Sequence, residues 1–206
     1  MKRVPVELSE RLLPAAAVFA AQGFDDTRVE DLARVTGIPR ATLYYYFSGK
    51  EDILAHLLTG LLQQVAEAVA EAIDSPGSAI ERLDAVIRAQ LRVLAANPDT
   101  CQVLLAELGR AGRLPDTAEA IEHAFHRPVH RLLDEGVRAG SMRSVPKDSA
   151  VSAIFGAVVL PGLHHLVLHG SLDADRVADE VLPLLLHGLA QSPAARRPRR
   201  RGPARG

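Results

Sequence analysis

The sequence has one cysteine, Cys101, among 206 residues and no tryptophan. A single cysteine excludes an internal disulfide framework and fits a protein of the reducing cytosol. The first residues, MKRVPVELSERLL, carry charges where a secretion signal has an apolar core. The longest apolar run, residues 149–170, is interrupted by Pro161 and by a histidine pair, as is typical of a buried helix and not of a membrane span. These absences predict a cytoplasmic protein without a membrane partner.

Signals for β-structure are also missing. Val, Ile and Thr do not alternate with polar residues, and no Asn-Gly or Asp-Gly hairpin signal occurs. Apolar residues instead recur at helical spacing, and Gly and Pro divide the chain into segments. The sequence therefore predicts an all-α fold of about nine helices, at about residues 8–23, 27–37, 39–47, 48–73, 79–96, 98–110, 115–140, 147–169 and 173–190.

Prolines and capping residues predict the details of these helices. Pro14 and Pro128 fall inside expected helices, where a proline removes a backbone hydrogen bond and kinks or breaks the helix. A Ser or Thr followed three residues later by Glu predicts an N-terminal capping box. Such pairs at expected helix starts include Thr27 with Glu30, and Ser48 with Glu51.

Charge is unevenly distributed, although the net charge is only −1. Residues 51–195 carry 11 Lys or Arg against 19 Asp or Glu, whereas residues 196–206 carry six Arg and no acid. A polyanion would therefore meet the ends of the chain and not its acidic middle. Residues 192–206 are rich in Arg, Pro, Ala and Gly, which predicts a disordered tail.

Aromatic residues are scarce, with three Tyr and five Phe, yet four of them are consecutive at Tyr44–Phe47. They end the second of two short helices, 27–37 and 39–47, whose Gly-containing turn is the spacing of a helix-turn-helix; its second helix enters the DNA major groove. Three successive tyrosines span most of a helix circumference, so some hydroxyls must face water or a phosphate backbone. The expected buried side consists of Leu32, Val35, Ile38, Leu43 and Phe47.

The stretch from about Leu8 to Leu54 resembles the N-terminal DNA-binding domain of the tetracycline-repressor (TetR/AcrR) family. The matching residues are VFAAQGFDDTRVEDLARVTGIPRATLYYYFSGKEDIL, residues 18–54. The matching features are Gly-Phe after the first helix, Thr before the second, and the pattern Thr-Leu-Tyr-Tyr-x-Phe-x-x-Lys-Glu. The resemblance implies a homodimeric, ligand-responsive transcription factor. It implies a three-helix DNA-binding domain at 1–54 and a helical ligand-binding and dimerisation domain at 55–191.

The resemblance also assigns DNA contacts by position. Arg40, Ala41 and Tyr44 fall where the family reads base edges, and Arg40 suits guanine because bidentate Arg–guanine pairing is the commonest specific contact. Tyr46 departs from the more usual His, and packing within the domain is its alternative role. For Arg28 the alternative to a phosphate contact is a side chain that is exposed to water only. The residues implied to hold phosphates are Thr27, Arg28, Thr42, Tyr45, Tyr46 and Lys50.

Residues 55–191 contain no arrangement that predicts an enzyme. No Gly-rich phosphate loop follows a strand, and Ser and Cys have no evident triad partners. His123, His126 and His130 share a helical stripe, and His165 and His169 are four apart, a spacing that can chelate a metal. No compact ligand motif accompanies them, and their alternative is a pocket lining, a helix surface or a dimer seam. We therefore expect no metal, no cofactor and no catalytic residue.

The family encloses its ligand among the middle helices and dimerises through the last two, which implies the same here. The apolar interior and the lack of charge on apolar faces favour a small apolar effector. The residues that we predict to line its pocket are Leu94, Val103, Leu104, Leu108, Phe125, Val129 and Phe155.

The functional prediction is a repressor that a small organic effector releases from a palindromic double-stranded operator. A homodimer is needed because one helix-turn-helix reads only a few base pairs. The long helix 48–73 is expected to transmit the change from ligand to DNA. The alternatives are a transcriptional activator and a metal-responsive regulator of the same fold.

Overall fold

The computed structural model describes residues 3–108 and 119–187, and within these ranges it contains helices and no strand. The expected all-α fold of nine helices is confirmed for this part of the chain, counting α1 with α2, and η1 with α9, as interrupted single helices. The elements are α1 Val6–Leu12, α2 Ala15–Gln22, α3 Val29–Thr36, α4 Arg40–Tyr46, α5 Lys50–Asp74, α6 Ala79–Ala96, α7 Pro98–Leu108, the π-helix η1 Glu122–His126, α9 Arg127–Arg138, α10 Lys147–His169 and α11 Ala174–His187.

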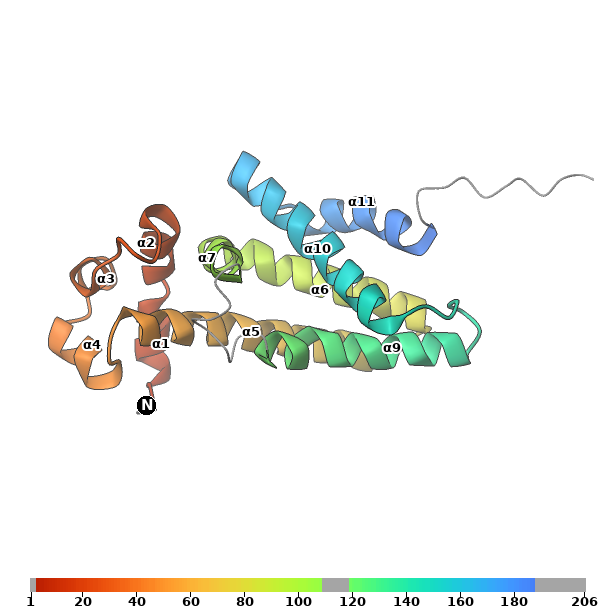
Figure 1. Cartoon of the computed structure of the whole chain (residues 1–206), viewed down its shortest axis with the longest axis horizontal. Helices are drawn as coiled ribbons and strands as arrows, with labels where there is room; N and C mark the ends of the chain where they lie inside the picture. Colours follow the sequence, from red (N-terminus) through yellow and green to blue (C-terminus); the bar gives the residue numbers. More distant parts are fainter. Residues whose placement is uncertain (1–2, 109–118, 188–206) are drawn as a thin grey trace, which may run out of the picture.

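Helices α1 to α4 gather at one end of the molecule, and α5 runs from them along the remaining helices (Figure 1). Helix α5 packs along α6, and α6 contacts α9, α10 and α11. The boundary expected between residues 54 and 55 falls inside α5, so one continuous helix belongs to both domains. Helix α5 therefore connects the DNA-binding end directly to the helices that follow (Figure 1).

Both prolines expected to disturb helices do so. At Pro14 the first helix breaks into α1 and α2, because proline has no N–H to donate to the carbonyl of Glu10. The Glu10 carbonyl accepts from the Leu13 N–H at 3.3 Å instead. Before Pro128 the chain forms the π-helix η1, whose wider turn lets the Arg127 N–H donate to the Glu122 carbonyl.

The two expected capping boxes are wrong. The N-cap of α3 is Arg28, and the Thr27 hydroxyl donates to the Gly23 carbonyl at 2.6 Å. Thr27 is only 1% exposed, so its hydroxyl is directed into the domain and not at the helix start. The N-cap of α5 is Gly49, and a different carboxylate, that of Asp52, accepts the Ser48 N–H at 2.8 Å.

The described part of the fold has two large apolar cores and a small third cluster, which consists of Leu61, Leu94 and Cys101. One lies among α1 to α5 and includes Leu32, Ile38, Leu43 and Phe47, as expected. Val35 was expected there too, but it is 44% exposed, because it lies on the outer side of α3. The second core lies among α5, α6, α9, α10 and α11.

Candidate nucleic-acid interface and effector cavity

Helix α4 presents one face to the core and the other to solvent. Leu43 is fully buried, whereas Tyr44 is 51% and Tyr45 is 59% exposed. Arg40 and Ala41 are exposed as well. The outer face of α4 thus carries the three residues predicted to read bases, and Tyr45 beside them. This arrangement suits a helix that enters a DNA groove.

Tyr46 has a different environment from the two tyrosines before it. Its side chain is half-buried and packs against the core of the DNA-binding end. Its ring meets the Tyr45 ring edge-on, with 4.9 Å between centroids. The structure therefore places Tyr46 where packing within the domain, the alternative role, is satisfied, whereas Tyr45 is largely exposed.

Arg40 is paired with an acidic residue of α3 when no DNA is bound. Its guanidinium lies 2.6 Å from a Glu30 carboxylate oxygen, and both side chains are about half exposed. An exposed ion pair of this kind contributes only about 0–1 kcal/mol. Replacing it with a guanine contact costs little, so the pair does not oppose the predicted base contact.

Among the predicted phosphate-binding residues, Arg28 is exposed and Thr42 is half-buried. The Thr42 N–H donates to the Pro39 carbonyl at 2.9 Å. The Thr27 hydroxyl hydrogen is used within the domain, as described above. The assignment of all three to phosphate stays a prediction.

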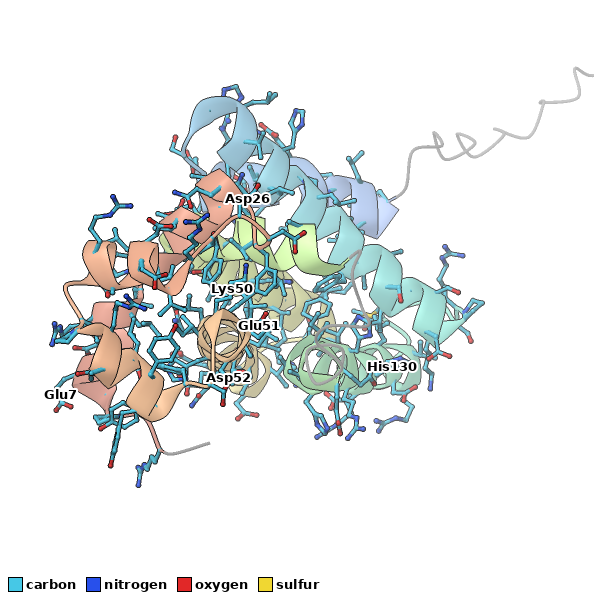
Figure 2. The ribbon with its side chains drawn as sticks, turned by 60° about the vertical axis from the view of Figure 1, so that its left-hand side comes forward. Glu7, Asp26, Lys50, Glu51, Asp52 and His130 are labelled. Carbon is cyan, nitrogen blue, oxygen red and sulfur yellow. The ribbon has the colours of Figure 1, made fainter. Side chains whose placement is uncertain are left out.

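Lys50 is directed at the loop that precedes α3 (Figure 2). Its Nζ donates to the carbonyls of Phe24 and Asp25, each at 2.8 Å, and to that of Thr27 at 3.0 Å. It also lies over the Phe24 ring, 4.7 Å from the centroid. An ammonium has three N–H donors, so all are used, and a phosphate contact requires the release of one. This role could not be predicted from the sequence, because every residue has a backbone carbonyl and residue types do not show which carbonyls lie near Lys50.

An apolar cavity lies among α5, α6, α7, η1 and α10. The space inside it that water can enter is only about 30 Å³, so a larger ligand must push the walls apart to enter. Among the described residues no charged side chain lines it. Its walls include Leu61 of α5, Leu94 of α6, Leu104 of α7, Phe125 of η1, and Phe155 and Val159 of α10.

Four of the predicted lining residues face this cavity: Leu94, Leu104, Phe125 and Phe155. Val103 and Val129 are buried elsewhere, the first against the DNA-binding end and the second in the C-terminal core. Leu108 belongs to α7, but its side chain lies outside the described residues. Adjacent positions on a helix are about 100° apart, so Val103 and Leu104 point in different directions from α7.

Two lining residues are not hydrocarbon, Gln90 and Cys101. Burial raises the pKa of the Cys101 thiol to about 12. The thiol is therefore protonated at neutral pH and is a weak nucleophile and a weak hydrogen-bond donor. Gln90 was not predicted as a site residue, because one glutamine in a helix that is otherwise amphipathic reads as a surface residue.

Aromatic rings and the π-helix shape one wall of the cavity. The Phe125 and Phe155 rings lie 5.3 Å apart, and the His126 ring meets Phe155 edge-on at 5.7 Å. The π-turn η1 carries Phe125 into this position. Single π-turns are frequent at functional sites because they redirect side chains that a regular helix would bury elsewhere.

Several histidines lie beside carboxylates, each beside a different one. His126 Nδ1 lies 3.1 Å from Glu122, and His130 Nε2 lies 3.1 Å from Asp148. The His165 and His169 rings are 5.3 Å apart, and Arg176 lies 3.1 Å from His165. Over residues 3–108 and 119–187, no three His, Cys, Asp or Glu side chains are grouped so as to hold a metal ion. Figure 2 shows His130 far from the start of α5, on a different part of the molecule.

Helix α7 connects the cavity to the DNA-binding end. Leu104 lines the cavity and also packs against the N-terminal core, while Val103 is buried within that core. Helix α7 packs directly against α2. Helix α5 makes a second connection, since the His56 Nε2 lies 3.0 Å from the Ser9 hydroxyl of α1. Two helices, not one, therefore link the cavity walls to the DNA-binding end.

Comparison with known proteins agrees with this architecture. Residues 12–57 match the family described as "Bacterial regulatory proteins, tetR family". Residues 76–189 match "Tetracyclin repressor-like, C-terminal domain". The chain is 33% identical over 197 residues to the HTH-type transcriptional repressor KstR2 of Mycobacterium tuberculosis, covering 93% of this chain and 98% of that protein.

A second relative is the fatty acid metabolism regulator protein of Bacillus subtilis, 27% identical over 177 residues, which are 85% of this chain and 91% of that protein. The crystal structure of the transcriptional regulator FadR from Bacillus subtilis in complex with stearoyl-CoA superimposes with a TM-score of 0.76 at 24% identity, covering 88% of this chain and 99% of that one. The chain accordingly belongs to the tetR family of bacterial regulatory proteins and is a DNA-binding transcriptional regulator.

Proposed function

We propose that the protein is a homodimeric repressor that leaves a palindromic operator when a largely apolar effector occupies the cavity. The observation that carries this proposal is the cavity itself, because one of its walls, α7, packs on the DNA-binding end. A relative along nearly the whole chain is named a transcriptional repressor, which supports repression over activation. As a DNA-binding regulator, the protein acts in the cytoplasm and is not an enzyme.

A second copy of the chain is the proposed partner of the last two helices. Large apolar side chains are exposed there: Leu160, Val167 and Leu168 on α10, and Leu184 and Leu186 on α11. A dimer through α10 and α11 covers this face and sets the spacing of two α4 helices on a palindrome.

By length and composition α5 and α10 could each cross a membrane, but α5 lies within the bundle, and such helices are common in the cores of soluble proteins.

The domain limits follow from this division of labour. Residues 1–54 form the DNA-binding domain, and residues 55–191 hold the cavity and the dimer contacts. Helix α5 belongs to both. The Arg-rich segment 192–206 lies outside the described residues, and its disorder stays a prediction.

The effector is proposed to be a molecule with a long apolar portion. Hydrocarbon side chains and two phenylalanine rings line the cavity, and burying apolar surface among them is favourable at about 25 cal/mol per Å². One relative is named a fatty acid metabolism regulator, and the FadR structure contains stearoyl-CoA. A similar structure is described as the ketosteroid transcriptional regulator KstR2. Fatty acyl and steroid compounds are therefore the classes to test first.

Release from DNA is proposed to follow from the movement of α7 and α5. A ligand that fills the cavity displaces Leu104, and α7 then shifts α2, with which it packs. A hundredfold loss of DNA affinity requires about 2.7 kcal/mol of coupling between the two sites. The same coupling must weaken ligand binding by the same factor when operator DNA is bound.

Two measurements test the proposal. Fluorescence anisotropy with DNA from upstream of the gene gives operator affinity with and without stearoyl-CoA or a steroid thioester. Calorimetric titration of the active compound into the protein, alone and saturated with operator, gives the reciprocal coupling. Equal ligand affinities in the two titrations would overturn release by an effector in this cavity.

A further inference from the structure

Gln90 is a buried polar residue in an apolar cavity. It belongs to α6, it is 1% exposed, and it forms part of the cavity wall. Its Oε1 atom is buried and has no hydrogen-bond partner within the part of the chain that the structure describes. Among the described residues, the cavity wall therefore includes a side chain whose buried amide oxygen has an unused hydrogen-bonding capacity.

This arrangement is unfavourable for the protein alone. Buried polar side chains are almost always hydrogen-bonded, because an unpaired buried carbonyl loses its contacts with water and gains nothing in return. The neighbouring buried positions of α6, Ile87, Leu91 and Leu94, are hydrocarbon, and a leucine or methionine at position 90 would continue that face. A polar residue at this place is explained if a bound molecule supplies the missing partner.

The chemistry of the cavity limits what that partner is. Oε1 accepts hydrogen bonds, so the bound group must donate one. No charged side chain is present among the described lining residues, so a carboxylate or phosphate beside Gln90 would be buried without a counter-charge. The group must also donate without carrying a charge, and a neutral hydroxyl meets both conditions.

We propose that Gln90 is a specificity residue that selects, among apolar effectors, those with a neutral hydroxyl on the portion buried in the cavity. The inference rests on the proposed function, because it takes the cavity to be the effector site. It adds that the buried part of the effector is not plain hydrocarbon. Cys101 is the other hetero-atom side chain described in the wall, and its thiol is too weak a hydrogen-bonding group to replace Gln90.

A pair of simple probes tests the inference. Decanol carries a hydroxyl on an alkyl chain, and decyl methyl ether lacks the donor but keeps the chain and the oxygen. Calorimetric titration into the full-length protein should show decanol binding at least about tenfold more tightly than the ether, equivalent to about 1.4 kcal/mol. In Gln90→Met, which keeps an unbranched side chain and removes the amide, the ratio should fall to about one.

A matched control is Gln63→Met, because Gln63 is exposed on α5 and is hydrogen-bonded to Glu67 at 3.2 Å. This variant should keep the preference of the unaltered protein. Thermal unfolding without ligand gives a second readout: Gln90→Met should unfold at a higher temperature, because an unpaired amide is replaced by an apolar group.

The outcomes separate the two proposals. Binding of both probes with the same preference in Gln90→Met as in the unaltered protein would overturn the role of Gln90 and leave the cavity as an effector site. Clearly lower thermal stability of unliganded Gln90→Met would also overturn it, since the amide would then have a structural partner. Failure of both probes to bind any variant would overturn the effector site and the specificity residue together.

Discussion

Replacing Lys50 with methionine should destabilise the DNA-binding end of the protein without changing the number of phosphate contacts. In the structure the Lys50 ammonium holds the loop before α3 against α5 through the carbonyls of Phe24, Asp25 and Thr27. Methionine keeps an apolar side chain near the Phe24 ring but removes all three donors. The change therefore isolates the hydrogen bonds from the packing of the side-chain stem.

The magnitude follows from those three bonds. A hydrogen bond to a charged group contributes about 1.5–3 kcal/mol when it is buried. Lys50 is only half-buried and the bond to Asp25 is exposed, so water replaces part of the loss. We expect the free energy of unfolding to fall by about 2–3 kcal/mol in total, below the sum of three buried bonds.

The assay is urea denaturation at one protein concentration, because dimerisation makes stability depend on concentration. Lys147→Met is the control: Lys147 forms an exposed ion pair with Asp134 far from the DNA-binding end, and its loss should cost less than about 1 kcal/mol. DNA affinity is then measured over a range of salt. A residue that contacts phosphate contributes about 0.9 to the slope of log affinity against log salt concentration.

The two roles of Lys50 thus give opposite results. If it fixes the loop, Lys50→Met loses stability and keeps the salt slope. An unfolding free energy within about 0.5 kcal/mol of the unaltered protein, together with a salt slope lower by about one, would refute this reasoning and restore the phosphate contact.

Three further predictions concern other residues. Arg40→Ala should relax base choice at one position in each half-site at a cost of about 1–3 kcal/mol, measured on operator variants; equal losses on operator and random DNA would contradict it. Burial lowers the pKa of His56, so its contribution to stability is complete above its ordinary pKa of about 6.5 and is lost as the pH falls through the lowered value. The free energy of unfolding should therefore fall less between about pH 7 and pH 5 in His56→Gln than in the unaltered protein. Identical pH dependence in both proteins would exclude His56 as the cause. Cys101, with its pKa raised to about 12, should react with iodoacetamide far more slowly than a free thiol at pH 8, followed by mass spectrometry, and urea should remove the difference.

Helix positions and the outer face of α4 were predictable because they depend on neighbours in the sequence. Gly37 ends α3 in a left-handed conformation that favours glycine, and Pro14 divides α1 from α2. Leu43 and Phe47 are four residues apart, so one helical face buries both and turns Tyr44 and Tyr45 outward. Each of these features is decided within one or two helical turns.

Roles that depend on distant segments were not predictable in the same way. The phosphate contact of Lys50 stays a prediction, but its hydrogen bonds to the loop 24–27, more than 20 residues away in sequence, could not be predicted from the sequence. Thr27 fits an N-cap by its spacing, but the helices packed around it bury its side chain, and its hydroxyl donates to the Gly23 carbonyl four residues earlier.

The helical class, the helix-turn-helix and the exposed tyrosines of α4 could be predicted from the residues alone, because helical periodicity and backbone-breaking residues act locally. Which apolar residues border the cavity depends on how the helices pack together. Val103 and Leu104 are both apolar and are neighbours on α7, which lies between the DNA-binding end and the cavity. Val103 is therefore buried against the DNA-binding end, and Leu104 lines the cavity. Gln90 likewise reads as a surface residue until α5, α7, η1 and α10 enclose it. Hydrophobicity specifies that a side chain is buried, and the packing of helices distant in sequence specifies against what.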